Sequence, residues 1–176
     1  MSISYTTYKK HIIDFENFND DLIDIDDIAH ALSLTCRFGG QCDYFYSVAQ
    51  HSINCYKKAL HDGLNDILLY ALLYDASEAY MCDIPSPLKK LIPEYKRIEN
   101  IVSSKIFNKY CGKDIDTNIH DTIKKIDNDI FEIEYQVLMN NGKNDYDYLN
   151  FDYQKQIDIE KEFINCFNEI KEDFND

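Results

Sequence analysis

Apolar residues recur at intervals of three and four along most of this chain, a spacing that predicts helices. The pattern runs over Asp26 to Leu34 and again from about Ser47 to Leu60, and Gly39-Gly40 break the chain between them. From Asp66 to Met81 the first half is apolar on nearly every side. That segment therefore predicts a central buried helix.

The second half of the chain continues the helical pattern. A loop is expected at Asp83 to Pro87, because each proline biases the preceding residue away from helix. Pro93 can open a helix that reaches Tyr110. Two more helices are expected at about Asp116 to Met139 and Tyr153 to Phe174, separated by the polar residues 140–147. With five glycines and three prolines, breakers are too few for regular strands, so the prediction is all-α, a single compact bundle of about six helices.

Length and composition narrow the possibilities further. At 176 residues and 45% hydrophobic content, the chain suits one domain spanning residues 1–176. It has no apolar stretch near the roughly 18 residues that a membrane span needs, so we expect a soluble, cytoplasmic protein. Six cysteines without a CxxC pair favour reduced thiols over disulfides or a zinc site. A net charge of -14 repels nucleic-acid backbones, which argues against a polymer-binding module.

Four side chains could carry chemistry. Asp75 and Glu78 are carboxylates three residues apart in an apolar segment, and burying them is costly unless a cation or metal pairs with them. A solvated, salt-bridged face is the simpler alternative. His51 by itself is more often a hydrogen-bonded structural residue than a ligand. Asp127 is equally unremarkable in isolation.

Taken together, these residues sit in five ordered blocks that resemble the HD-domain superfamily, and in particular its bacterial and phage nucleotidase branch. The blocks cover about residues 24–135 and are DIDDIAHALSLTCRFGG (24–40), YSVAQHS (46–52), LLYDASEAYMCDIPSPLKKL (72–91), EYKRIE (94–99) and KKID (124–127). One block alone would be a weak match, but their order makes the signal specific. His61-Asp62 is also an HD pair, but Gly63 follows it and the surrounding motif is absent, so we assign it no role.

The resemblance implies a divalent metal and a phosphorylated substrate. It places the metal ligands at His51, Asp75 and Asp127, a mixed set that suits Mn, Co, Fe, Zn or Mg. It also implies that Glu78 and Asp83 position or activate the attacking water. Two cationic residues, Arg37 and Lys89, would contact phosphate, Arg37 with a bidentate fork and Lys89 with a point charge.

Two residues depart from the family pattern. Tyr74 stands where the defining histidine belongs, and a neutral phenol is a poor metal ligand. Gln41 stands where phage-type relatives usually carry a histidine after RFGG, at a position that looks substrate-facing. Glutamine can form hydrogen bonds but cannot shuttle a proton. Both departures lie in the pocket that the resemblance describes.

Two functions follow as expectations. The first is a metal-dependent phosphohydrolase that acts on a deoxynucleoside mono- or triphosphate. The second is a catalytically inactive nucleotide-binding protein with weakened or no metal binding. A purely structural interaction role has no motif behind it. Relatives of this kind form dimers or larger assemblies, so we also expect a homo-oligomer, with a small nucleotide as the ligand.

Overall fold

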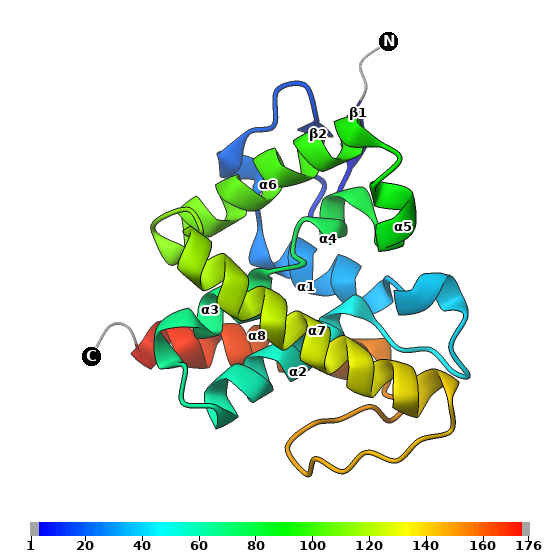
Figure 1. The fold of residues 1–176 in the computed structure, drawn as a ribbon. Helices are drawn as coiled ribbons and strands as arrows, with labels where there is room; N and C mark the ends of the chain where they lie inside the picture. Colours follow the sequence, from blue (N-terminus) through cyan, green and yellow to red (C-terminus); the bar gives the residue numbers. More distant parts are fainter. Residues whose placement is uncertain (1–3, 174–176) are drawn as a thin grey trace.

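The computed structural model describes residues 4–173 and is all-α apart from one small hairpin (Figure 1). The main helices are α1 (Ile25–Leu34), α2 (Val48–His61), α3 (Leu68–Leu73), α6 (Pro93–Cys111), α7 (Thr117–Met139) and α8 (Gln156–Asp173). Two single-turn helices, α4 (Glu78–Met81) and α5 (Ser86–Lys89), connect α3 to α6. Helix α7 runs across the front of α2 and α3 in Figure 1. Among the described residues, no helix is long and apolar enough to cross a membrane.

Helix α2 lies at the centre and packs against α1, α3, α7 and α8. Its start is fixed locally by a capping box, since the Ser47 hydroxyl accepts from the Gln50 amide and the Gln50 side chain accepts from the Ser47 amide. The core around it consists of fully buried aliphatic and aromatic side chains, among them Ile28, Leu32, Val48, Leu72, Ile106, Ile123, Ile130 and Phe163. Burial of this apolar surface is the main force that holds the helices together.

The expected helix from Asp66 to Met81 is not continuous, which corrects the prediction. A 3-10 turn (Asn65–Ile67) precedes α3, and residues 74–77 form turns before α4. Across this break the amide of Ala76 donates to the carbonyl of Leu73, and that of Glu78 donates to that of Asp75, both at 3.0 Å. Residues three apart eclipse one another in such tight turns. Asp75 and Glu78 are therefore stacked on one side of the chain.

Other boundaries also differ from the sequence expectation. Residues Ser4–Thr6 and Ile12–Asp14 form an antiparallel hairpin, where only helix was expected. The buried carboxylate of Asp27 holds this hairpin on α1, because it accepts from the Thr7 hydroxyl at 2.7 Å and the Lys9 amide at 2.6 Å. Helix α5 begins inside the expected proline loop, because proline is tolerated in a first turn.

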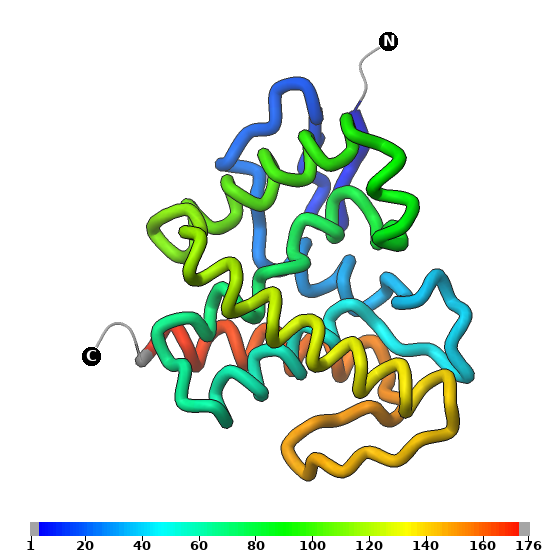
Figure 2. The backbone as a smooth tube through the Cα atoms, viewed as in Figure 1, coloured from blue at the N-terminus to red at the C-terminus, as the bar shows by residue number. Residues whose placement is uncertain are grey.

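The C-terminal part of the chain closes the bundle from behind. Helix α8 begins at Gln156, three residues later than expected, and Phe174 lies outside the described residues. The connection before it, residues 140–155, loops out beneath α7 and returns to α2 (Figure 2). Asn54 of α2 fastens it, since its side chain donates to the Asn150 carbonyl at 2.8 Å and accepts from the Asn150 amide at 3.0 Å.

Candidate metal centre and cleft

The three predicted metal ligands converge from separate elements. His51 comes from the first turn of α2, Asp75 from the break after α3, and Asp127 from the middle of α7. One ligand atom from each lies within 4.8 Å of the others. His51 Nε2 is 3.1 Å from Asp127 Oδ1 and 3.5 Å from Asp75 Oδ2. The fold thus assembles the set that the sequence singled out.

The geometry and chemistry of this group fit a divalent cation. Ligand atoms about 2.1 Å from an ion lie about 3.0 to 3.4 Å apart in octahedral or tetrahedral shells, and the His51 distances of 3.1 and 3.5 Å are close to this range. One imidazole and two carboxylates are ligands that Mn, Co, Fe and Zn accept. Two neighbouring carboxylates need positive charge nearby, which Arg37 gives to Asp75 and Lys124 gives to Asp127, and a bound cation would add to it. The described residues supply three protein ligands, which leaves coordination positions for water or phosphate.

Tyr74 contacts a different partner. Its hydroxyl lies 3.3 Å from Nε2 of His120, one of the α7 residues that face the cleft. Burial, together with the negative charges of Asp127 and Asp75, raises the pKa of Tyr74 well above its ordinary value. The phenol therefore stays neutral and is a poor metal ligand. The sequence interpretation missed His120, which lies seven residues before Asp127 and hence on the same side of α7.

Both ring nitrogens of His51 have further polar neighbours. Glu134, which is 0% exposed, accepts from His51 Nδ1 at 2.7 Å and from the Tyr46 hydroxyl at 2.9 Å. On the other face of His51, the Cys55 thiol lies 3.4 Å from Nε2. Sequence analysis assigned no role to Glu134. Its signal was a charged residue on the apolar face of α7, seven residues after Asp127.

Arg37 forms ion pairs with two carboxylates of the site. Its guanidinium lies 3.1 Å from Glu134 Oε2 through Nη2 and 3.5 Å from Asp75 Oδ2 through Nη1. Both partners are carboxylates, so Arg37 offsets negative charge beside the candidate metal ligands. Arg37 also lines the cleft, so it could contact a ligand there.

Lys89 bridges two buried carboxylates. Its ammonium lies 2.9 Å from Glu78 Oε1 and 2.7 Å from Glu99 Oε1, while Lys96 lies 2.9 Å from Glu99 Oε2. Glu78 Oε2 is buried with no hydrogen-bond partner among the described residues. Burial, then the charges of Asp75 and Asp83, raise the pKa of Glu78 to about 8. Glu78 is therefore largely protonated at neutral pH.

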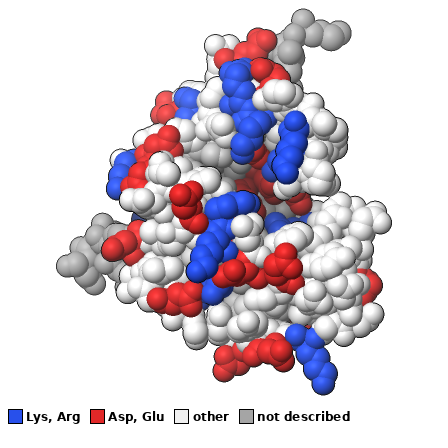
Figure 3. All heavy atoms as spheres, viewed as in Figure 1, with Lys and Arg blue, Asp and Glu red and all other residues white. Residues whose placement is uncertain are grey.

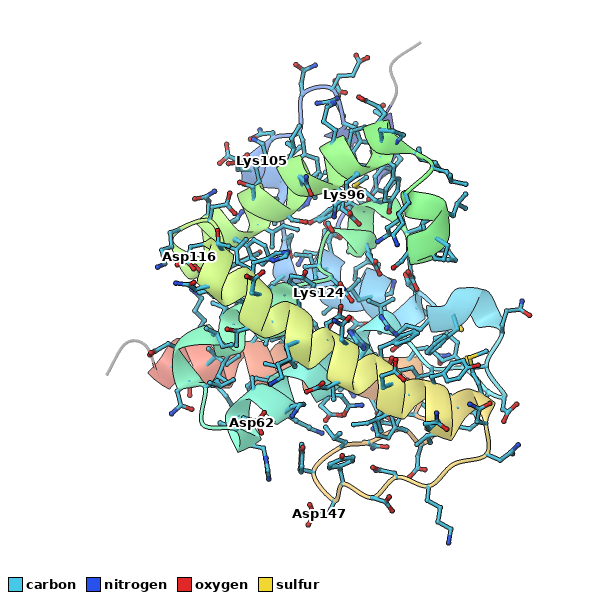
Figure 4. The ribbon with its side chains drawn as sticks, in the orientation of Figure 1. Asp62, Lys96, Lys105, Asp116, Lys124 and Asp147 are labelled. Carbon is cyan, nitrogen blue, oxygen red and sulfur yellow. The ribbon has the colours of Figure 1, made fainter. Side chains whose placement is uncertain are left out.

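These groups line one cleft of about 650 Å³ between α6 and α7. Figure 3 shows a hollow with acidic side chains in its depth and basic side chains around it. Lys96 of α6 and Lys124 of α7 lie on opposite sides of the opening (Figure 4). The lining includes Arg37, Phe38, Tyr74, Asp75, Glu78, Asp83, Lys89, Lys96, Glu99, His120, Lys124, Asp127 and Phe131. Basic side chains around the opening could bind an anionic ligand, while the acidic side chains inside the cleft could bind a metal ion.

The remaining predicted residues fall into two groups. Asp83 is half-buried and lines the cleft, as the sequence interpretation requires. Gln41 is exposed at the end of the turn Arg37–Gly40 and is not among the residues that line the cleft. His61-Asp62 lies at the far end of α2, where the His61 ring stacks on Tyr148 with centroids 4.1 Å apart. Nothing in that position brings the pair to the cleft.

The known proteins that are similar to this chain are uncharacterized, so they indicate no activity. No family model matches the chain. An uncharacterized protein of Escherichia coli, YfdR, is 44% identical over 110 residues, which are 62% of this chain and 59% of that protein. An uncharacterized protein of Rhodobacter capsulatus is 41% identical over 76 residues, 40% of this chain and 38% of that protein. The chain thus matches less than two thirds of the length of either relative.

Proposed function

We propose that this chain is a metal-dependent phosphohydrolase that acts on a nucleotide phosphate, with the HD-domain architecture that its sequence blocks resemble. The observation that carries the proposal is the convergence of His51, Asp75 and Asp127 at one point of a cleft that is also lined by the buried carboxyl of Glu78. His51, Asp75 and Asp127 would hold the metal. When bound, such an ion polarises a phosphoryl oxygen and makes a bound water more acidic.

Glu78 supplies a proton in this proposal. As water adds to phosphorus, the bond from phosphorus to the ester or anhydride oxygen breaks, and that oxygen needs a proton to leave. The Glu78 carboxyl can give it, because Glu78 lines the cleft and its pKa of about 8 keeps most of the group protonated at neutral pH. The carboxylate left behind faces Lys89, and solvent returns the proton after the product leaves. Asp83, on the same wall of the cleft, would orient the attacking water.

The cationic residues of the cleft suit the charge of a phosphate. Lys96 pairs with Glu99 and Lys124 with Asp127, but their side chains are 61% and 49% exposed, so both can turn toward a ligand at the opening. Lys89 is held between Glu78 and Glu99, and Arg37 between Glu134 and Asp75. These two half-buried cations are held by carboxylates on two sides, so we assign them to the charge balance and orientation of the site as well as to phosphate. Phosphate selectivity would then rest on the lysines of the rim.

A non-catalytic nucleotide-binding protein is the second candidate. The observation in its favour is that Tyr74, at the position of the missing histidine, is half-buried against His120, while Arg37 already offsets the charge of Asp75. A ligand could then be held by the cations of the cleft with little or no metal. This function predicts nucleotide binding that does not depend on added metal.

One experiment separates the two candidates. Purified protein is incubated with Mn or Co and a panel of nucleoside mono- and triphosphates, and phosphate release is measured beside binding by calorimetry. The hydrolase predicts metal-dependent release that Glu78→Gln and Asp127→Asn abolish, whereas Lys58→Met, at an α2 residue that does not line the cleft, leaves it unchanged. Binding without release by any nucleotide favours the second candidate. If no nucleotide binds with or without metal, both are wrong.

A further inference from the structure

Glu134 is a fully buried carboxylate behind the candidate metal centre, and the proposed reaction gives it no step. Its Oε1 accepts from His51 Nδ1 at 2.7 Å and from the Tyr46 hydroxyl at 2.9 Å. Its Oε2 accepts from Arg37 Nε at 3.2 Å, and Nη2 of the same guanidinium lies 3.1 Å away. Donors thus occupy both oxygens of one carboxylate that is 0% exposed.

Donors on both sides mean that Glu134 acts as an acceptor at each oxygen. Arg37 is always charged, and the Tyr46 hydroxyl can give its proton. The proton between Glu134 and His51 therefore lies on Nδ1 of the ring. Nε2 is the nitrogen left to face Asp75 and Asp127.

We propose that Glu134 is a positioning residue that fixes the tautomer and the ring orientation of His51 for metal binding. The inference rests on the metal site of the proposed function, but it does not depend on hydrolysis. Helix α7 carries both Asp127 and Glu134, two turns apart, so one rigid element sets the position of one ligand and the orientation of another. A ligating histidine commonly donates its second N–H to such an acceptor, and loss of the acceptor typically weakens metal affinity about 10- to 100-fold.

A purely structural pairing with Arg37 is the alternative explanation for Glu134. Tyr46 allows the two to be told apart, because it is equally buried and donates to the same Oε1 without contacting the metal ligands. Tyr46→Phe removes a hydrogen bond of Glu134 while the bond to His51 remains. Glu134→Gln keeps the volume but places an amide N–H against one of the donors, so the bond to His51 or the pairing with Arg37 is lost.

The test measures the dissociation constant of Mn and of Co for the full chain by titration calorimetry. We expect Glu134→Gln to weaken binding about 10- to 100-fold. Tyr46→Phe should lower the melting temperature of the metal-free protein but leave the metal dissociation constant near the wild-type value. Equal metal affinity in wild type and Glu134→Gln would overturn the inference, as would an equal loss of affinity in both variants.

A second measurement needs no variant and decides the matter if Glu134→Gln does not fold. Long-range proton–nitrogen NMR of the zinc-loaded wild type should show the His51 ring proton on Nδ1 and the metal on Nε2. A metal on Nδ1 would overturn the inference. Wild type that binds no metal at all overturns it together with the proposed metal site, whereas metal binding without phosphate release counts only against hydrolysis.

Discussion

Replacement of Glu78 by glutamine should remove a pH dependence from the stability of the fold. Glu78 is only 6% exposed, and its pKa rises from 4.5 to about 8 in the folded state because of burial, Asp75 and Asp83. Between these values the folded protein holds a proton that the unfolded chain has released. Stability contributed by this group is therefore greatest at low pH and is lost as pH rises through about 8.

The magnitude follows from the two pKa values. At about 1.4 kcal/mol per tenfold change, the free energy of unfolding of wild type should fall by about 3 kcal/mol from pH 5.5 to pH 8.5 through Glu78 alone. Glutamine resembles the protonated acid in shape and cannot ionise. The difference in unfolding free energy between wild type and Glu78→Gln should thus change by about the same 3 kcal/mol over this range. Groups that titrate equally in both proteins contribute equally to both unfolding free energies, so they cancel in that difference.

Urea denaturation at several pH values between 5.5 and 8.5 measures the effect. Glu99→Gln is the matched control, since Glu99 shares Lys89 with Glu78. Although burial opposes it, the hydrogen bonds from Lys89 and Lys96 hold the pKa of Glu99 below its ordinary value. Its contribution is present above pH 4.5 and is lost only as pH falls further, so this variant should show a constant difference from wild type across the window. Parallel pH profiles of wild type and Glu78→Gln would refute the reasoning.

Three further predictions concern the same cleft. Tyr74→His should tighten Mn and Co binding at least about tenfold by calorimetry, because it adds an imidazole beside Asp75. Adding Gln41→His should bring no further gain, since Gln41 lies outside the cleft. Unchanged metal affinity in Tyr74→His would show that Tyr74 does not replace a ligand. Lys89→Met should cost about 3 kcal/mol of unfolding free energy, because it leaves the buried Glu78 without its cation and Glu99 with Lys96 alone. Lys96→Met, at a 61% exposed side chain, should cost less than about 1 kcal/mol, and equal losses would contradict this order. Asp127→Asn should abolish the rise in melting temperature on addition of Co, while His61→Ala, at the exposed end of α2, should retain it.

Local sequence determined most of the helices. The capping box of Ser47 and Gln50 starts α2, Asp116 caps α7, and Pro93 opens α6, all within one or two residues of the expected positions. These features depend on hydrogen bonds and dihedral preferences of neighbouring residues, which a sequence shows directly. The resemblance of the five sequence blocks, and not the residue types taken one by one, marked His51, Asp75 and Asp127 as ligand candidates before any fold was known.

The tertiary structure alone decided how those side chains meet. The apolar pattern predicts a straight helix and not the break between α3 and α4, although residues three apart such as Asp75 and Glu78 share a face in either case. Glu134 orients His51 from 83 residues away in sequence, and Tyr74 meets His120 from 46 residues away. Such pairs form because the helices pack in one arrangement and buried polar groups must find partners there. Periodicity and spacing describe one segment at a time, so they predict the helices and not the contacts between them.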